Sequence, residues 1–472
     1  MDGKDGKETP PEGGGEGNNT INGNNLEGKA EGQSSSVNLL EKLREQFTGL
    51  FFGGFADPEI FTASQGGRPH GHDGADRAPT EEHGNESATE KASALEGISK
   101  FSMRPQDIRD YLQRFVIRQE EAKKVLAVTI CDHYNHVRRC LASPKELIRD
   151  YGKPNVLLLG PTGVGKTYLI RNLAKLLGVP FVKADATKFT ETGYVGNDVE
   201  EMVRDLVRAA NGDVELAQYG IIFVDEIDKI ASNEAMGRDV SGRGVQVNLL
   251  KLMEDAEVSC VAPNDITAQM SAMVTFGGRR HRRESISTRH ILFIVSGAFD
   301  RLNELVRRRS SAGSIGFTKK GFDDGGEDYL RLATTADFVQ FGLEPEFIGR
   351  LPVRVACEHL RKKDLAQILI SSEGSILRQY EKDFEGYGIE LTLTEEAIYA
   401  IAGLAEEEKT GARGLMTVLE RLFRDFKFHL PSTTIRRLNI TEEIVRDPTT
   451  ALRKLLADSS AQAEDIQRIH FP

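Results

Sequence analysis

Few cysteines, no long apolar run and a shortage of positive charge characterise this sequence, and each shortage excludes a class of protein. The 472 residues include four cysteines, which give no disulfide framework and indicate a reducing cytoplasm. No apolar run approaches the roughly 20 residues that a membrane-spanning helix needs. The first residues carry acidic side chains and no apolar core, unlike a secretory signal or a transit peptide. We therefore expect a cytoplasmic protein with no membrane partner.

The charge balance bears on the kind of partner. Lysine and arginine number 61 against 72 aspartates and glutamates, which gives a net charge of −11. A broad nucleic-acid surface needs clustered Lys and Arg. The balance therefore argues against a nucleic-acid partner and is compatible only with a local basic patch. The length allows more than one domain.

Residues 1–95 are predicted to be mostly disordered, with one short amphipathic helix near 38–52. Residues 1–37 contain too few apolar side chains to offset the entropy of ordering. A lone helix of the length of 38–52 is marginal in water, so it needs a partner surface. Docking on its own domain or its own ring is favoured over an adaptor-binding element. Its apolar face contains Leu39, Leu40, Leu43, Phe47, Leu50 and Phe51.

Packed structure is predicted from about residue 100 onward. Short apolar runs typical of buried parallel strands recur, with helical patterns such as 167–177 between them. Strands that alternate with helices predict an α/β fold with a parallel αβα sandwich, here over residues 96–356. The predicted strands are 156–159, 181–182, 221–224, 291–295 and 351–353.

The pattern changes after residue 356 and becomes mostly helical. One strand candidate remains, at 389–393. We expect a smaller C-terminal domain over residues 357–450, followed by a tail at 451–472. No internal repeat is present.

Residues 160–167 match the phosphate-binding loop G-x-x-x-x-G-K-[ST] at every fixed position, between a predicted strand and a predicted helix. Glycines let backbone N–H groups turn toward phosphates, and the helix N-terminus adds a positive dipole. We expect Lys166 to contact the β- and γ-phosphates of ATP and Thr167 to bind Mg²⁺. The strand and helix context disfavours a chance loop. The predicted nucleotide-binding residues are Gly160, Pro161, Thr162, Gly163, Val164, Gly165, Lys166 and Thr167.

The apolar run 221–224 ends in Asp225 and Glu226. Open α/β sheets bind ligands beyond the carboxyl ends of their strands, so this pair is predicted to complete the site. Asp225 would position the hydrated Mg²⁺, and Glu226 would act as the general base that polarises the attacking water. For an isolated Asp-Glu pair a solvated strand end would be the better interpretation, but the upstream loop favours the site.

Several longer strings make the chain similar to the ClpX family of AAA+ unfoldases. The resemblance covers roughly residues 100–450 in one consistent order, which is more specific than any single motif. It implies an AAA+ P-loop NTPase fold with a helical lid domain, ATP hydrolysis, a homo-hexamer, a ClpP-type peptidase as partner, and unfolded or tagged proteins as substrates. The matching strings are 121–128, 192–196, 238–246, 277–281, 314–317, 345–352 and 411–415.

The resemblance assigns two loops to protein partners. Tyr194 and Val195 would lie in a pore loop, where an aromatic flanked by glycines can grip polypeptide of any sequence. Ile315, Gly316 and Phe317 match the tripeptide by which the family docks its peptidase, and large apolar side chains on a polar loop favour a partner's pocket. The alternatives are a tyrosine packed under a turn and a loop folded onto its own core.

Two arginines also take roles from the resemblance. Arg350 would reach the γ-phosphate held by the neighbouring subunit and stabilise transition-state charge. Arg413 would contact the nucleotide of its own chain and couple it to the domain angle. A solvated arginine is the alternative for Arg413, which the flanking Gly-Ala and Gly-Leu disfavour.

The sequence departs from the family at several points. The family usually begins with a zinc-binding domain built on Cys-x-x-Cys pairs, which this sequence does not contain. Arg118 replaces the expected glycine beside the adenine pocket, residues 256–276 form a longer loop, and Ser296 takes a polar position at the end of the fourth strand. We predict no zinc site, because a lone helix cannot wrap four tetrahedral ligands. The helix in question carries Cys131, His133, His136 and Cys140.

The sequence thus predicts an ATP-dependent unfoldase and translocase that delivers substrates to a ClpP-type peptidase. One alternative is an ATP-driven chaperone that works without a peptidase, which the segment 315–317 disfavours. A non-catalytic ring scaffold is disfavoured by the intact Lys166 and Glu226. A nucleic-acid motor is disfavoured by the acidic charge balance.

Overall fold

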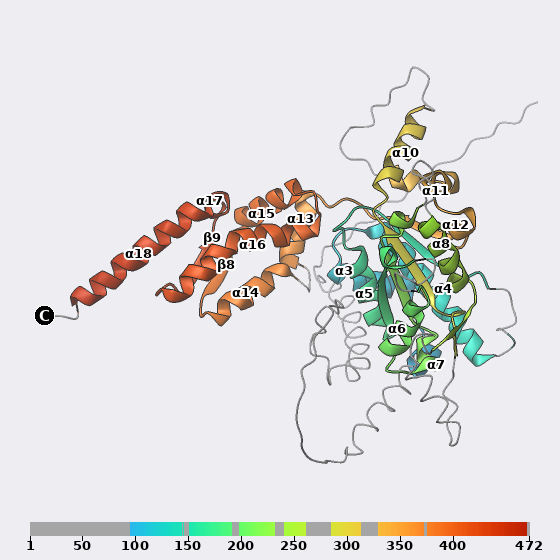
Figure 1. Ribbon diagram of the computed structural model, residues 1–472. Helices are drawn as coiled ribbons and strands as arrows, with labels where there is room; N and C mark the ends of the chain where they lie inside the picture. The colour runs from blue at the N-terminus through green and yellow to red at the C-terminus, as the bar shows by residue number, and fades with distance from the viewer. Residues whose placement is uncertain are drawn as a thin grey trace, which may run out of the picture. The chain divides into compact units, whose positions relative to one another are not determined.

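A computed structural model describes the part of the chain from residue 95 to residue 469, with gaps (Figure 1). Contacts divide the chain after residue 78, and all described residues belong to the unit 79–472. The predicted helix near 38–52 lies outside the described residues. In the described part, no helix has the length and apolar character to cross a membrane. The described ranges are 95–143, 145, 151–190, 198–231, 240–260, 285–312, 329–371 and 375–469.

A five-stranded parallel sheet forms the centre of the first half of the described chain, in the order β2-β3-β6-β1-β7. Every residue of β1 and β6 is buried. Because successive strand side chains point to opposite faces, both faces of the sheet are covered. This confirms the predicted α/β fold. The strands are β1 Val156–Leu159, β2 Phe181–Asp185, β3 Ile221–Asp225, β6 Leu292–Gly297 and β7 Val353–Ala356.

Helices and short connecting elements surround this sheet. Helix α4 packs on β7, α5 packs on β3, and α6 packs on β2 and β3. A separate antiparallel pair joins β4, Glu257–Ser259, to β5, Ser285–Ser287. The helices are α3 Pro105–Phe115, α4 Glu120–Ala142, α5 Lys166–Leu177, α6 Glu201–Ala209, α7 Val214–Ala217, α8 Val240–Met253, α10 Asp300–Ala312, α11 Thr335–Phe341 and α12 Pro345–Gly349, with 3₁₀ turns at Ala186–Lys188, Ile227–Ile230 and Tyr329–Leu332.

The structure shifts some predicted boundaries. The last strand was predicted from residue 351, but β7 begins at Val353. Pro352 has no N–H to donate to a strand ladder, so the pairing begins after it. The pair β4–β5 was not predicted, because each strand buries one side chain only, Val258 and Ile286.

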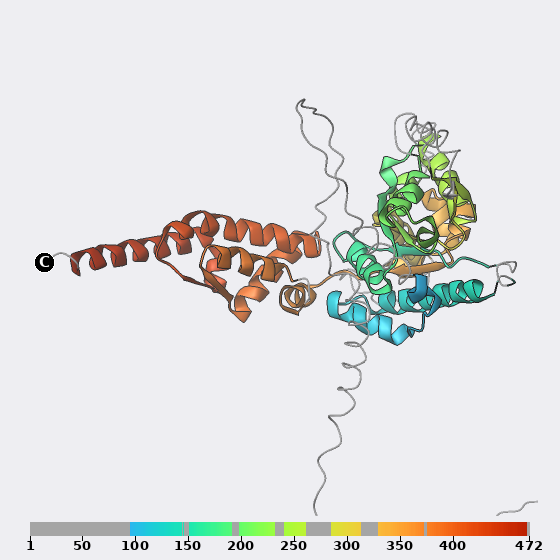
Figure 2. The same ribbon diagram turned by 90° about the horizontal axis from the view of Figure 1, so that it is seen from below.

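The second half of the described chain is mostly helical and contains a two-stranded parallel sheet of β8 and β9. Figures 1 and 2 show this sheet beside helices α14, α15 and α16, and α18 as one continuous helix near the C-terminus. β9 was not predicted, because it has only four residues, of which two are apolar, and so short a segment gives little periodic signal. The elements are α13 Lys362–Ser371, α14 Ile376–Gly386, β8 Glu390–Leu393, α15 Glu395–Glu407, α16 Ala412–His429, a 3₁₀ turn Leu430–Ser432, β9 Arg437–Ile440, α17 Glu442–Arg446 and α18 Pro448–Ile469.

Buried apolar residues form two separate clusters. The first extends in sequence from Ile98 to Cys357 and includes the five-stranded sheet. The second extends from Leu365 to Leu452 and is built around aromatic residues such as Phe384 and Phe423, whose ring centroids lie 5.4 Å apart. Leu360 packs against both clusters. The chain between Cys357 and Leu365 is therefore the connection between two hydrophobic cores.

Candidate nucleotide site

Three neighbouring strands end at one edge of the sheet and define the candidate site. β6 lies between β1 and β3, and all three run parallel. The phosphate-binding loop follows β1, Asp225 ends β3, and Ser296 is the fifth residue of β6. Parallel strands place their carboxyl ends at the same edge. The sheet therefore brings the loop and the carboxylate together, although 58 positions separate Thr167 from Asp225.

Lys166 begins helix α5 and folds back over the loop. Its ammonium donates to the carbonyl oxygens of Gly160, at 2.6 Å, and Pro161, at 2.9 Å. The side chain is 9% exposed, and burial is the main reason that its pKa is lowered. The negative charges of Asp225 and Asp228 oppose this shift, and the positive charge of Arg413 adds slightly to it. Arg413 is exposed, so Lys166 is the desolvated cation, and a desolvated cation at a helix N-terminus favours an anion such as a phosphate.

Asp225 lies among groups that favour its ionised form. It accepts hydrogen bonds from the hydroxyls of Ser296 and Thr167, the latter at 3.3 Å, and lies 3.4 Å from the ammonium of Lys183. Burial opposes ionisation, but the Ser296 hydroxyl, Lys183 and nearby backbone and lysine groups together hold the pKa of Asp225 below its usual value. The Asp225 carboxylate and the Thr167 hydroxyl together present oxygen atoms, which are the ligands that Mg²⁺ prefers.

Glu226 follows directly and has an unusual backbone. Its φ is 58°, in the left-handed region that non-glycine residues rarely adopt, and its side chain is exposed. Its N–H donates to the carboxylate of Asp225 at 3.1 Å. Such backbone strain is common at functional sites. The turn presents the Glu226 carboxylate to solvent at the strand edge, where a water could be bound.

The backbone of the C-terminal half touches the phosphate-binding loop. The N–H of Ala412 donates to the carbonyl of Gly163 at 2.8 Å. A Cβ added to Gly163 would lie 2.0 Å from the carbonyl oxygen of Thr410, and one added to Gly411 would lie 2.6 Å from the oxygen of Gly163. Both positions also have positive φ, so only glycine permits this approach. Arg413 is the next residue of α16 and is thereby placed beside the loop.

Arg350 lies at the other edge of the sheet. It comes three positions before β7, and its carbonyl accepts from the Asn155 amide at 3.1 Å, directly before β1. The phosphate-binding loop follows the far end of β1, so the length of that strand, roughly 13 Å, separates them. The guanidinium of Arg350 is 56% exposed and pairs with Glu254 at 2.7 Å.

The predicted partner loops lie outside the described residues. This applies to Tyr194 and Val195 and to Ile315, Gly316 and Phe317; the matching string 277–281 lies outside the described residues as well. The longer loop at 256–276 is described only up to residue 260. Their assignments stay predictions.

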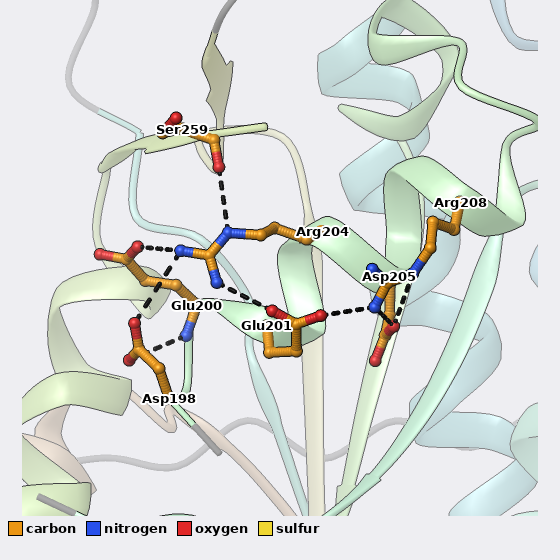
Figure 3. Close-up of polar contacts among 7 residues, drawn as sticks. All are labelled: Asp198, Glu200, Glu201, Arg204, Asp205, Arg208 and Ser259. Atoms are coloured by element: carbon orange, nitrogen blue, oxygen red, sulfur yellow. Dashed lines mark hydrogen bonds and ion pairs between the residues drawn. The ribbon is translucent and has the colours of Figure 1, made fainter. Parts of the chain in front are cut away.

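A buried arginine, Arg204, was not predicted (Figure 3). It is 4% exposed on α6 and donates to the carboxylates of Glu200, at 2.7 Å, and Glu201, at 3.0 Å. It also donates to the carbonyl of Ser259 at 3.2 Å, at the end of β4, and lies 3.9 Å from Asp198. One guanidinium thus joins α6 to β4. Acidic residues three and four positions before an arginine on an apolar helix face were the available signal.

The cysteine and histidine residues of α4 take part in packing. His136 and Cys140 are in contact at 3.3 Å, whereas the Cys131 thiol donates to the Met103 carbonyl at 3.4 Å. His133 is in contact with the His290 carbonyl at 3.0 Å. Among the residues that the structure describes, no group of three or more such side chains is placed to hold a metal ion.

The fold and this site define a P-loop ATPase of the AAA class. In agreement, residues 152–354 match the family described as AAA domain (Cdc48 subfamily). That span begins shortly before β1 and ends within β7.

Named relatives narrow the class further. The chain is 43% identical over 349 residues to the ATP-dependent Clp protease ATP-binding subunit ClpX of Borrelia duttonii, which covers 72% of this chain and 78% of that protein. The same figures hold for the ClpX of Borrelia recurrentis. The ClpX of Treponema denticola is 42% identical over 368 residues, 76% of this chain and 85% of that protein. The chain therefore belongs to the ClpX family, and the resemblance found from its motifs is confirmed.

Proposed function

We propose that this chain is an ATP-dependent protein unfoldase and translocase that delivers substrates to a ClpP-type peptidase. The main support is the convergence at the sheet edge, where Lys166, Thr167 and Asp225 lie together and the backbone of Gly411 and Ala412 touches the loop. The relatives are named as ATP-binding subunits of an ATP-dependent Clp protease. The two hydrophobic cores support a large AAA+ domain over 96–356 and a small lid domain over 357–450.

Each residue at this edge of the sheet would have a separate role in ATP hydrolysis. The loop N–H groups and Lys166 would bind the β- and γ-phosphates of ATP, and Arg413 would add a second cation from the small domain. Thr167 and the ionised Asp225 would hold Mg²⁺, which when bound neutralises charge that develops on the phosphates. Glu226 would accept a proton from the water that attacks the γ-phosphorus. Because Gly411 and Ala412 contact the loop directly, phosphate release would change the contact between the two domains.

A homo-hexamer is part of this proposal. Arg350 lies across the sheet from its own loop, so it would act on the ATP of a neighbouring subunit. Arginines supplied in this way stabilise transition-state charge on the phosphoryl group. A closed ring is the symmetric assembly in which every site receives such an arginine.

The partner assignments rest on the sequence and on the relatives' names. We propose that Tyr194 and Val195 grip unfolded or tagged substrates, and that Ile315, Gly316 and Phe317 dock the peptidase. The name of the relatives refers to a Clp protease, which favours this function over a peptidase-independent chaperone. We propose a cytoplasmic location and no nucleic-acid partner, from the cysteine content and the net charge of −11.

A degradation assay tests the proposal. The full chain is combined with ATP, a tagged stable substrate and ClpP, and loss of the substrate is followed. We expect degradation only when all components are present, and loss of at least about 100-fold of the ATP turnover in Glu226→Gln, because the general base is removed. Glu304→Gln is the matched control, since Glu304 is 69% exposed in a surface pair on α10. If ATP turnover survives in Glu226→Gln, the assigned role is wrong. If ATP is hydrolysed but the substrate stays folded, the unfoldase function is wrong.

A further inference from the structure

Two consecutive residues between α3 and α4 have left-handed backbones. Arg118 has φ of 61° and Gln119 has φ of 65°, and neither is glycine. Such a conformation is disfavoured for side chains that carry a Cβ. It persists only where surrounding contacts stabilise it. The contacts of these two residues identify what holds the turn.

Gln119 forms hydrogen bonds with the chain segment that connects the two hydrophobic cores. Its side-chain amide donates to the carbonyl of Glu358 at 2.8 Å, and its carbonyl oxygen accepts from the N–H of Glu358 at 2.7 Å. Gln119 is 2% exposed, so both bonds are shielded from water. Glu358 comes two positions after the end of β7. The turn therefore fixes the point at which the chain leaves the sheet.

Arg118 reaches further, into the small domain. Its guanidinium donates through Nε to the carboxylate of Glu358 and through Nη1 to Asp364 at 2.7 Å. Asp364 lies in the first turn of α13 and also accepts from the N–H of Arg361 at 2.8 Å. Arg331 pairs with the same Glu358. Burial disfavours the charged guanidinium, but the two carboxylates outweigh it and raise the pKa of Arg118. One side chain thus spans the turn, the connection and the first helix of the small domain.

The small domain touches the large domain at a second place, the phosphate-binding loop. There, the N–H of Ala412 donates to the carbonyl of Gly163 at 2.8 Å, and Arg413 is the next residue of α16. The arrangement that Arg118 stabilises at α13 is therefore the one that places Arg413 beside the phosphate-binding loop.

We propose that Arg118 is a positioning residue, an ionic latch across the connection between the domains that holds Arg413 at the nucleotide site. The inference rests on the proposed function of that site. Without the latch, the small domain samples more orientations, and Arg413 is less often in place to bind the phosphates. Loss of the latch raises the KM for ATP more than it lowers kcat, because Glu226 and Asp225 belong to the large domain and stay in position.

The test uses variants that distinguish the effect of the Arg118 charge from the effect of its left-handed backbone. Arg118→Asn removes the charge, and Asn tolerates left-handed φ. Arg118→Lys keeps the charge, but an ammonium cannot present two N–H groups in a fixed fork to two carboxylates. Asp364→Asn removes one partner and keeps an acceptor for the N–H of Arg361. The matched control is Arg109→Asn, which breaks the exposed pair with Asp110 on α3.

The full chain is measured for KM and kcat of ATP hydrolysis and for its melting temperature. We expect Arg118→Asn and Asp364→Asn each to raise KM about threefold to tenfold, with kcat within about twofold, and Arg118→Lys to lie between wild type and Arg118→Asn. The double variant Arg118→Asn with Asp364→Asn should be no worse than the more impaired single variant, since both remove the same contact. Arg109→Asn should match wild type.

Two results overturn the inference. The first is an unchanged KM in Arg118→Asn, which together with a lowered melting temperature would make the contact structural only. The second is that the effects of the two substitutions on KM multiply in the double variant. The variant Lys166→Ala distinguishes a failure of the latch from a failure of the proposed function. If Lys166→Ala still hydrolyses ATP, the site assignment itself is wrong; if it is inactive while the Arg118 variants keep wild-type KM, only the latch is wrong.

Discussion

At the scale of single residues, the candidate site depends on positions where only one residue type fits. Gly163 is such a position, because its φ is 77° and the Thr410 carbonyl occupies the space of a Cβ. The motif requires glycine only at its first and sixth positions, so Gly163 is not fixed by the phosphate-binding pattern. The approach of the small domain is what excludes every other side chain.

Gly163→Ala should therefore weaken ATP binding. The added methyl would force Thr410 away and displace Arg413, so we expect KM for ATP to rise about tenfold or more, the equivalent of about 1.4 kcal/mol. Gly178→Ala is the matched control, since Gly178 also has positive φ, 64°, but no atom lies within 4 Å of the added Cβ. It should lose only about 1 kcal/mol of stability from backbone strain. Equal KM values for the two variants, measured by ATP hydrolysis, would contradict the close approach seen here.

Two buried histidines predict a stability that depends on pH. Burial lowers the pKa of His133 from 6.5 to about 3 and that of His290 from 6.5 to about 4. Both are neutral in the folded state, whereas the unfolded chain takes up protons below pH 6.5. The contribution of these two histidines to the free energy of unfolding is therefore full above that pH. It is lost as the pH falls, by about 1.4 kcal/mol per pH unit for each histidine.

Urea unfolding between about pH 7.5 and about pH 5 measures this dependence. In His133→Gln, the free energy of unfolding should depend less steeply on pH, by the contribution of one histidine. His359→Gln is the control for the substitution itself, because His359 is exposed. A wild-type slope in His133→Gln would show that His133 does not carry the effect.

At the scale of elements, Arg204 joins a helix to a short strand (Figure 3). Arg204→Met keeps the buried volume but removes the donors to Glu200, Glu201 and the Ser259 carbonyl. The carboxylates are partly exposed and can be hydrated, so we expect a loss of about 1–2 kcal/mol in the free energy of unfolding. Chemical denaturation measures it. Arg208→Met, on the same helix but 63% exposed, should lose less than about 0.5 kcal/mol. A loss no larger than that of Arg208→Met would argue against the joining role.

Elements differed in how well the sequence predicted them. β1, β3 and β6 are buried on both faces, so they are continuous apolar runs that can be recognised without a partner. β4, β5 and β9 are short and bury one or two side chains each. Their pairing is decided by the elements around them, which a local pattern does not contain.

At the scale of the whole molecule, Arg350 tests the proposed ring. We expect Arg350→Ala to lower ATP turnover at least about 100-fold while the assembly still binds ATP. The control is Arg308→Ala, because Arg308 is 83% exposed in a surface pair. Mixing Arg350→Ala subunits with Glu226→Gln subunits should restore part of the turnover, since a site with intact Glu226 can then receive an arginine from its neighbour. Full turnover in Arg350→Ala alone, or no recovery in the mixture, would contradict action between subunits.

The sequence by itself determined the fold class, the phosphate-binding loop, the carboxylate pair and the family. Each of these can be recognised from a contiguous run of residues or from a fixed spacing between residues. Only the tertiary structure showed that Ser296 bonds to Asp225, that Arg118 reaches Asp364 and that Arg204 reaches the end of β4. In these three contacts the partners lie 71, 246 and 55 positions apart. No local pattern encodes such contacts, since they form only when packed strands and helices bring distant side chains within hydrogen-bonding distance.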